Sequence, residues 1–262
     1  MSGHTRFQRH PSLDHVGVLS FSNPGKLNAM SIAMWQELTA LMPSPALHGL
    51  RALILRGEDG SFISGGDIEE FPDFRFDVER LRAFHEGVVA PALRALADCD
   101  IPLVAQIDGA CVGGGLEIAL QCDLRICGES SRFGAPIARL GFPMAPDELL
   151  AVARITGLAT AAEMLLEARL LDAPTARARG LVHRVCPDGE VGAEAAATAG
   201  RIAAGAPHVA RAHKQMLRML ARGAQGFTDD QRAAFAGYAP MHDHREGITA
   251  FIEKRQPQFL GR

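Results

Sequence analysis

The 262-residue sequence is poor in lysine and has no long apolar segment. Both shortages argue against particular classes of binding partner. Lysine occurs only at Lys26, Lys214 and Lys254, so arginine carries most of the positive charge, and the formal net charge is −3. A nucleic-acid-binding surface is normally basic, so we expect no nucleic-acid partner. No apolar run reaches the ~20 residues that a membrane helix needs, so we expect no membrane partner.

Cysteine is also scarce, and the count of five is odd. The spacing of the five matches neither a zinc site nor a disulfide framework. The stretch from Met1 to Pro11 is polar and lacks the apolar core of a secretory signal. These features predict a reduced, cytoplasmic protein without a metal site. The length suits one domain with an appendage or two small domains, and the 47% hydrophobic content is ample for a core.

Short apolar runs alternate with segments of helical periodicity, and this order predicts an α/β fold. Strands are expected at 15–22, 51–56, 101–107 and 123–127. Helices are expected at 29–42, 85–98, 116–120, 149–155, 159–166, 191–204 and 207–219. The first ordered segment would then be the strand that begins at His15, and His85 would lie on the exposed surface of its helix.

The most informative stretch joins the strand expected at 101–107 to the helix expected at 116–120. A turn at Asp108-Gly109 precedes three consecutive glycines, Gly113 to Gly115, and Glu117 follows. The first N–H groups of a helix have no partner inside the helix and lie at the positive end of its dipole. The Gly114 N–H could therefore bind an oxygen that gains negative charge, with the Glu117 carboxylate about one helical turn away. Alternatively, the glycines only permit close packing and Glu117 is solvated.

This stretch resembles the enoyl-CoA hydratase/isomerase (crotonase) family. The family pattern A-x-x-G-x-x-x-G-G-G-x-E-x-x-x-x-C-D is met from Gly109 to Asp123, and Ala105 stands one position further from Gly109 than the alanine of the pattern. A second stretch, Phe62–Ile68, resembles the family's F-x-A-G-x-D-[IL] motif. In the family, the N–H between that Gly and Asp forms the second half of an oxyanion hole. The resemblance thus implies Gly66 and Gly114 as the two N–H donors and Glu117 as the acid/base residue.

The resemblance also implies contacts with coenzyme A as part of the substrate, and no permanently bound cofactor. Residues around Gly66 would bind the adenine and pantetheine, and the C-terminal motif E-G-x-x-A-F-x-E-K-R-x-P would bind the adenine and phosphates, sometimes from a neighbouring subunit. The implied coenzyme A residues are Lys26, Ser64, Gly65, Asp67, Ile68, Phe251 and Lys254. Lys26 could instead be a surface lysine in a turn, and Asp67 is expected to cap nearby N–H groups.

One departure from the family concerns the second catalytic carboxylate. Family hydratases place a glutamate directly after the proline of A-x-F-G-x-P, whereas this chain has Ile137 there. Asp147 and Glu148 stand where the family has paired glycines, so Glu148 could replace the missing carboxylate. Alternatively, these acids only favour the start of the helix at 149–155, after Pro146, and this interpretation is favoured.

The segment from Glu69 to Glu86 mixes phenylalanines with charged residues. In relatives this region closes over the acyl chain, so Phe71, Phe74 and Phe76 could contact substrate. They could equally pack only on one another.

The sequence thus predicts a crotonase-like spiral of ββα units over residues 1–205 and a helical region over 206–262 that forms a homotrimer or homohexamer. The implied function is that of an acyl-CoA lyase or isomerase that stabilises a thioester enolate, with weak hydration of crotonyl-CoA because of Ile137. The alternative is a non-catalytic acyl-CoA-binding protein on the same fold. A Rossmann oxidoreductase is excluded, because no G-x-G-x-x-G follows the first strand. The acyl chain, and the choice between hydration and isomerisation, stay open.

Overall fold

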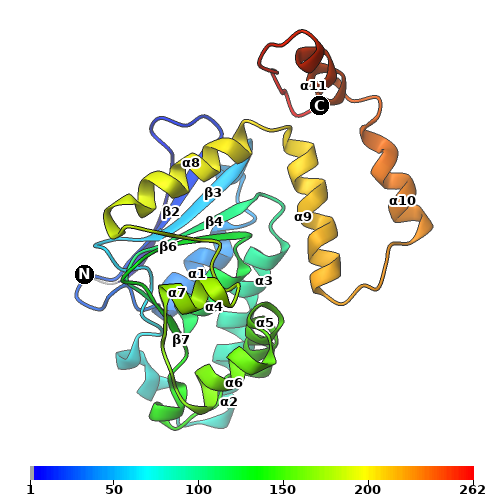
Figure 1. The fold of residues 1–262 in the computed structure, drawn as a ribbon. Coiled ribbons are helices and arrows are strands. Elements are labelled where there is room, and N and C mark those ends of the chain that lie inside the picture. The colour runs from blue at the N-terminus through cyan, green and yellow to red at the C-terminus, as the bar shows by residue number, and fades with distance from the viewer. Residues whose placement is uncertain (1–2) are drawn as a thin grey trace.

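The computed structural model describes residues 3–262 and has a six-stranded main sheet at its centre (Figure 1). The strand order is β1-β2-β3-β4-β6-β9. All neighbouring pairs are parallel except β1 and β2, which are antiparallel. The strands are β1 (His4–Arg9), β2 (Val16–Ser22), β3 (Ala52–Gly57), β4 (Leu103–Ile107), β6 (Leu124–Gly128) and β9 (Arg184–Cys186).

A second, smaller sheet is formed by short strands that follow strands of the main sheet in the sequence. It contains β5 (Ala110–Val112), β7 (Arg132–Gly134) and β8 (Leu171–Asp172) in the order β5-β7-β8. Single bridges, Met30 to Gly66 and Ile63 to Cys111, extend this arrangement after β2 and β3. The chain thus passes repeatedly from a main-sheet strand to a short second pairing and then to a helix, and the predicted spiral of ββα units is confirmed.

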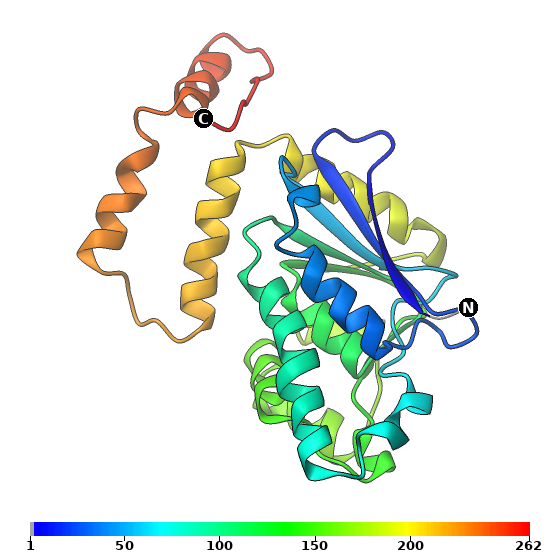
Figure 2. The ribbon, with the colours of Figure 1, turned by 180° about the vertical axis from the view of Figure 1, so that it is seen from behind.

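The main sheet is covered by helices on both faces (Figures 1 and 2). Side chains alternate along a strand, so Ala52 and Ile54 face one side while Leu53 and Leu55 face the other. The first side packs on Val191, Ala195 and Ala199 of the alanine-rich helix α8 (Val191–Ala203). The second side packs on α1 (Ile32–Leu41), α3 (Ala90–Asp98) and α4 (Gly114–Gln121). The remaining helices are α2 (Val78–Phe84), α5 (Pro146–Thr156), α6 (Leu158–Leu166), α7 (Ala173–Ala178), α9 (Pro207–Ala221), α10 (Asp229–Phe235) and α11 (His242–Ile252).

The expectation that ordered structure begins at His15 is wrong, because β1 precedes it. β1 is an edge strand whose side chains alternate between exposed and half-buried, so it contains no apolar run. The expected helix at 29–42 begins only at Ile32. Ser31 caps it by accepting a hydrogen bond from the Met34 N–H at 3.3 Å, while Met30 pairs with Gly66.

The helix expected at 85–98, by contrast, begins earlier in the chain than its sequence pattern indicated. It begins with α2 at Val78, passes through a π-helical turn over His85–Val89 and continues as α3. A π-helical turn inserts one residue into the helical repeat, and such turns often occur at functional sites. Here the π-helical turn precedes α3, which packs in the core, and its residues His85 and Val89 border a cavity.

The C-terminal helices extend away from the sheet (Figures 1 and 2). Helix α9 is attached to the core by ion pairs from Lys214 to Asp123 at 2.8 Å and from Arg218 to Asp100 at 2.7 Å. Helix α10 stands apart from the body in both views. The region carries large exposed apolar side chains, namely Leu217, Leu220, Phe235, Ile248, Phe251 and Ile252.

Membrane-spanning helices and clusters of metal-binding side chains are both absent from residues 3–262. No helix in this range combines the length and apolar character needed to cross a bilayer. In the same range, no cluster of three or more His, Cys, Asp or Glu side chains could hold a metal ion.

Candidate active site

A cavity of about 220 Å³ lies where the glycine-rich segments, α4 and the turns before α5 meet. Its polar side chains come from distant parts of the sequence, and they are Ser64, Arg75, His85, Glu117 and Glu148. Most of the remaining wall is apolar, with Trp35, Ile68, Phe71, Phe84, Val89, Val112, Ile137, Leu140, Phe142 and Met144. A concave, mainly apolar site with a few convergent polar groups is typical of a small-molecule site.

Two glycine-rich loops lie against each other at the cavity. Gly65 has φ +128° and Gly113 has φ +52° with ψ −120°, conformations that residues with a Cβ rarely adopt. A Cβ on Gly113 would lie 3.5 Å from the Gly65 Cα, and one on Gly114 would lie 4.0 Å from the Gly65 carbonyl carbon. A Cβ on Gly115 would lie 2.3 Å from the Ile63 carbonyl oxygen. The glycines thus allow the two loops to meet.

Hydrogen bonds fix both loops but leave two N–H groups free. The Met30 N–H donates to the Gly65 carbonyl at 2.8 Å, and the Gly113 N–H donates to the Gly134 carbonyl at 2.9 Å. Within residues 3–262, the N–H groups of Gly66 and Gly114 donate to no protein acceptor. Both glycines border the cavity. These two donors are therefore available to a ligand oxygen.

Glu117 lies in the first turn of α4 and borders the same cavity. It is 6% exposed, and its carboxyl group has no hydrogen-bond partner in the part of the chain that the structure describes. Burial raises the pKa of Glu117 well above its usual range; the negative charge of Glu148 raises it further, and the positive charge of Arg75 opposes the shift. A carboxyl group with a raised pKa can exchange a proton near neutral pH.

Glu148 belongs to the first turn of α5, which begins at Pro146, but its side chain is directed inward. It is 7% exposed, whereas the neighbouring Asp147 is exposed. Its Oε1 lies 2.7 Å from Nδ1 of His85. The helix-start interpretation therefore suits Asp147 and does not account for the burial and hydrogen bond of Glu148.

The expectation that His85 is a helix-surface residue is wrong. His85 begins the π-helical turn, its side chain is only 20% exposed, and it borders the cavity. Glu148 is 63 positions away in the sequence, so no local pattern could reveal the pair. The sequence signal was a titratable residue where the segment 69–86 overlaps the helix expected at 85–98.

Arg75 is a further cavity residue that sequence reasoning missed. Its guanidinium carbon lies 4.2 Å from the ring centroid of Phe71 and 3.9 Å from that of Phe142. Its Nε is buried without a hydrogen-bond partner. Burial lowers the pKa of Arg75, and the charges of Glu148 and Glu117 oppose the shift, but a guanidinium stays protonated in proteins. The cavity thus contains a fixed positive charge.

The three phenylalanines of the 69–86 segment take different positions. Phe71 borders the cavity. Phe74 is buried and stacks on Phe84 with centroids 4.0 Å apart. Phe76 is 86% exposed. Both interpretations of the segment therefore hold in part, because one ring lies at the cavity and another packs within the segment.

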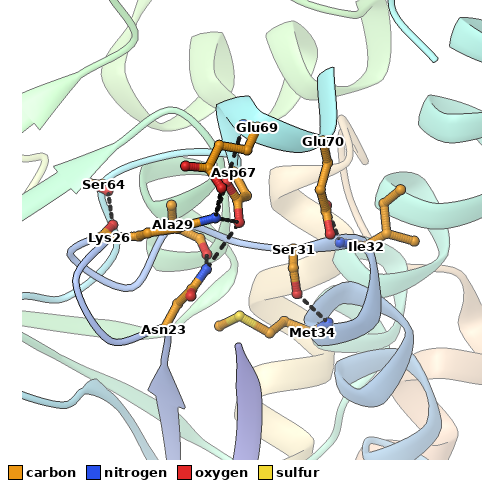
Figure 3. Close-up of polar contacts among 10 residues, drawn as sticks. All are labelled: Asn23, Lys26, Ala29, Ser31, Ile32, Met34, Ser64, Asp67, Glu69 and Glu70. Atoms are coloured by element: carbon orange, nitrogen blue, oxygen red, sulfur yellow. Dashed lines mark hydrogen bonds and ion pairs between the residues drawn. The ribbon is translucent and has the colours of Figure 1, made fainter. Parts of the chain in front are cut away.

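The predicted coenzyme A residues near Gly66 form a polar network (Figure 3). Nζ of Lys26 lies 2.7 Å from both Asp67 and Glu69, and the Ser64 hydroxyl donates to the Lys26 carbonyl at 3.0 Å. Asp67 accepts a hydrogen bond from the Glu69 N–H at 3.2 Å, so its predicted capping role is confirmed. Ser64, Gly65 and Ile68 border the cavity. Lys26 would have to release its carboxylates to bind a phosphate.

Phe251 and Lys254 are not brought to the cavity within one chain. Phe251 lies in α11 and is 86% exposed, and Lys254 follows the end of that helix. Figures 1 and 2 show α11 (red) and α2, near the cavity, at opposite ends of the molecule. A role for these two residues at the cavity of the same chain is therefore not supported.

Comparisons with known proteins agree with this architecture. A sequence model of the family described as "Enoyl-CoA hydratase/isomerase" matches residues 13–262. The chain is 34% identical to a Thermus thermophilus protein named "Putative enoyl-CoA hydratase", over 94% of this chain and 97% of that protein. It is 30% identical to the 2,3-dehydroadipyl-CoA hydratase of Escherichia coli, with 94% and 96% covered.

A solved structure supports the same assignment. An enoyl-CoA hydratase/carnithine racemase from Magnetospirillum magneticum superposes with a TM-score of 0.91 at 37% identity, covering 95% of this chain and 93% of that chain. Family match, near-complete coverage and fold agree, and the chain therefore belongs to the enoyl-CoA hydratase/isomerase family.

Proposed function

We propose that the protein is an acyl-CoA-processing enzyme of the hydratase or isomerase type, with Glu117 as its acid/base residue. The N–H groups of Gly66 and Gly114 hold the thioester oxygen, which gains negative charge when the substrate becomes an enolate. One observation carries the proposal: in the described residues, two N–H groups without an acceptor and one buried carboxyl without a partner border the same cavity. Removing one such donor typically costs about 10²–10³ in rate.

The alternative, a non-catalytic acyl-CoA-binding protein, is motivated by Ile137, which borders the cavity and cannot move a proton. The state of Glu117 favours catalysis. Burying a carboxyl group without a hydrogen bond costs stability, and that cost has a purpose when the group must exchange a proton with substrate. The named hydratases among the relatives also favour an enzyme.

We further propose that Glu148 and His85 together take the place of the second family glutamate. Hydration needs one group to accept a proton from water and another to protonate the α-carbon. In the His85 tautomer assigned by the hydrogen bond, Nδ1 donates to Glu148 and Nε2 is left as an acceptor. Glu148 would then orient the ring and stabilise its protonated form, as the aspartate does in a Ser-His-Asp triad. Isomerisation could use Glu117 alone, by returning the proton it removes.

Coenzyme A would enter only as part of the substrate. Ser64, Gly65, Asp67 and Ile68 adjoin Gly66, so the pantetheine and adenine would lie along this segment. Lys26 would exchange a carboxylate for a phosphate oxygen, for which an ammonium group is a suitable partner. Phe251 and Lys254 would reach the coenzyme only from a neighbouring subunit.

The first prediction tests binding. Calorimetric titration with butyryl-, hexanoyl- and octanoyl-CoA is expected to give dissociation constants in the micromolar range, about −8 kcal/mol. These thioesters are saturated, so binding is measured without turnover. Free coenzyme A is the control for the contribution of the acyl chain. No heat with any of the thioesters would contradict both the enzyme and the binding-protein hypotheses.

The second prediction concerns assembly. We propose that residues 206–262 form the contact of a homotrimer or of a hexamer made from two trimers. The exposed apolar side chains of α9 to α11 support this proposal, because adjacent exposed apolar residues commonly mark interfaces. Light scattering is expected to return about three or six times the 28.0 kDa of one chain. The mass of a single chain at working concentration would refute the proposal.

A further inference from the structure

We propose that Arg75 makes the cavity selective for acyl-CoA thioesters whose acyl chain ends in a carboxylate. The inference rests on the proposed function, since it takes the acyl chain to lie in this cavity. It adds the chemical class of the acyl group, which neither the glycine loops nor Glu117 can specify.

Arg75 has no ion-pair partner among residues 3–262. Its guanidinium packs against Phe71 and Phe142, and its buried Nε has no hydrogen-bond partner. No carboxylate among residues 3–262 lies within ion-pair distance of it. The Arg75 side chain as a whole is half-buried, but its Nε is shielded from water and has no acceptor, and such a donor is costly to leave unpaired. A negatively charged ligand group in the cavity would supply the missing acceptor.

The carboxyl groups of the cavity itself do not fill this role. One oxygen of Glu148 is engaged by His85 at 2.7 Å. The Glu117 carboxyl makes no ion pair with Arg75, and burial raises its pKa and so disfavours its charged form. Both groups influence Arg75 only through longer-range attraction. The pairing capacity of Arg75 therefore remains free for substrate.

The position of Arg75 indicates which part of a substrate would meet it. A Cβ on Gly66 would lie 3.1 Å from the Phe71 ring, and the Arg75 guanidinium lies on that same ring. The oxyanion donor and the cation thus adjoin the same phenyl ring, so a short acyl chain would suffice to reach from one to the other. Apolar side chains, including Leu140 and Phe142, would contact its methylene groups. A planar guanidinium binds a carboxylate through two parallel hydrogen bonds.

The experiment compares matched saturated thioesters by calorimetry: glutaryl- with valeryl-CoA and adipyl- with hexanoyl-CoA. In the wild-type protein, the thioester with the terminal carboxylate is expected to bind about 10- to 100-fold more tightly, the range of a charge-assisted hydrogen bond. Arg75→Met should reduce this ratio to about one or below, since the unpaired carboxylate then loses its partner. Arg82→Gln, an exposed arginine of α2 paired with Glu86, is the matched control and should keep the ratio.

A second measurement avoids mutation. The methyl ester of adipyl-CoA should bind wild-type protein about as weakly as hexanoyl-CoA, because the ester cannot form the ion pair. Equal wild-type affinity for both members of each pair would overturn the inference while leaving the proposed function intact. An equal loss of affinity for free coenzyme A in Arg75→Met would overturn it too, by assigning Arg75 to a phosphate. If no thioester binds, both the proposed function and this inference are contradicted.

Discussion

Glu117→Gln is expected to lower turnover of the true substrate by about 10²–10⁴-fold, the usual contribution of a general acid or base. Glutamine has nearly the same shape but cannot accept or return a proton. The affinity for saturated acyl-CoA should stay within about threefold, a change of well under 1.4 kcal/mol, because in the proposed site main-chain N–H groups, and not Glu117, hold the thioester oxygen. Steady-state kinetics and calorimetry on the same preparation separate the two effects. Full activity of Glu117→Gln would show that the acid/base residue lies elsewhere.

The same residue predicts two pH dependences. If Glu117 acts as a base, kcat/KM should rise with pH through its raised pKa, because only the ionised form accepts a proton. The contribution of Glu117 to stability should change in the opposite sense. A raised pKa means that the folded state binds the proton more tightly than the unfolded state, so the stability contributed by this group falls as pH increases from the unfolded pKa through the folded one.

Glu117→Gln mimics the neutral acid and should therefore lose less stability than wild type over that window. Thermal unfolding at pH 4, 6 and 8 checks the sign. Glu129→Gln, an exposed residue after β6, is the control and should follow wild type. If the stability of wild type relative to Glu117→Gln does not fall across the window, the assigned direction of the Glu117 shift is wrong.

Glu148→Gln is expected to reduce turnover by about 10²-fold or more if Glu148 and His85 carry the second proton transfer. Glutamine can still accept the hydrogen bond from His85 Nδ1, so the fold should be preserved. It cannot stabilise the protonated imidazole with a negative charge. His85→Asn should cause a similar loss, and the double variant should lose little more, because groups that act as a unit are not additive.

Asp147→Asn provides the matched control for this experiment. Asp147 and Glu148 both lie in the first turn of α5, where an acidic side chain contributes about 0.3–1 kcal/mol through the helix dipole. Asp147 is exposed, so its replacement should change only this contribution. If Asp147→Asn and Glu148→Gln both retain activity and lose equally little stability, Glu148 only stabilises the start of α5.

The sequence was sufficient for features governed by neighbours in the chain. Glycine suits position 113 because φ is positive there and position 115 because a Cβ would collide with the Ile63 carbonyl, and Asp67 caps the turn that follows it. Pro146 at the first helical position correctly indicated the start of α5. Alternating apolar runs predicted the α/β fold, because period-2 and period-3.6 patterns follow from backbone geometry. Strand β1 was not predicted, because an edge strand with few buried side chains lacks such a pattern.

Only the tertiary structure decided which charged side chains share the cavity. His85 and Glu148 lie 63 positions apart and meet because the π-helical turn and α5 border one cavity. Arg75 lies in a segment full of charged residues, and its sequence neighbours do not indicate that two phenylalanine rings shelter its guanidinium. The direction of a side chain depends on how distant helices and loops pack, and burial in that packing sets its charge and pKa. The local sequence therefore determined the fold and the glycine motif with Glu117 that we propose as catalytic, whereas long-range packing determined the other charged groups of the cavity.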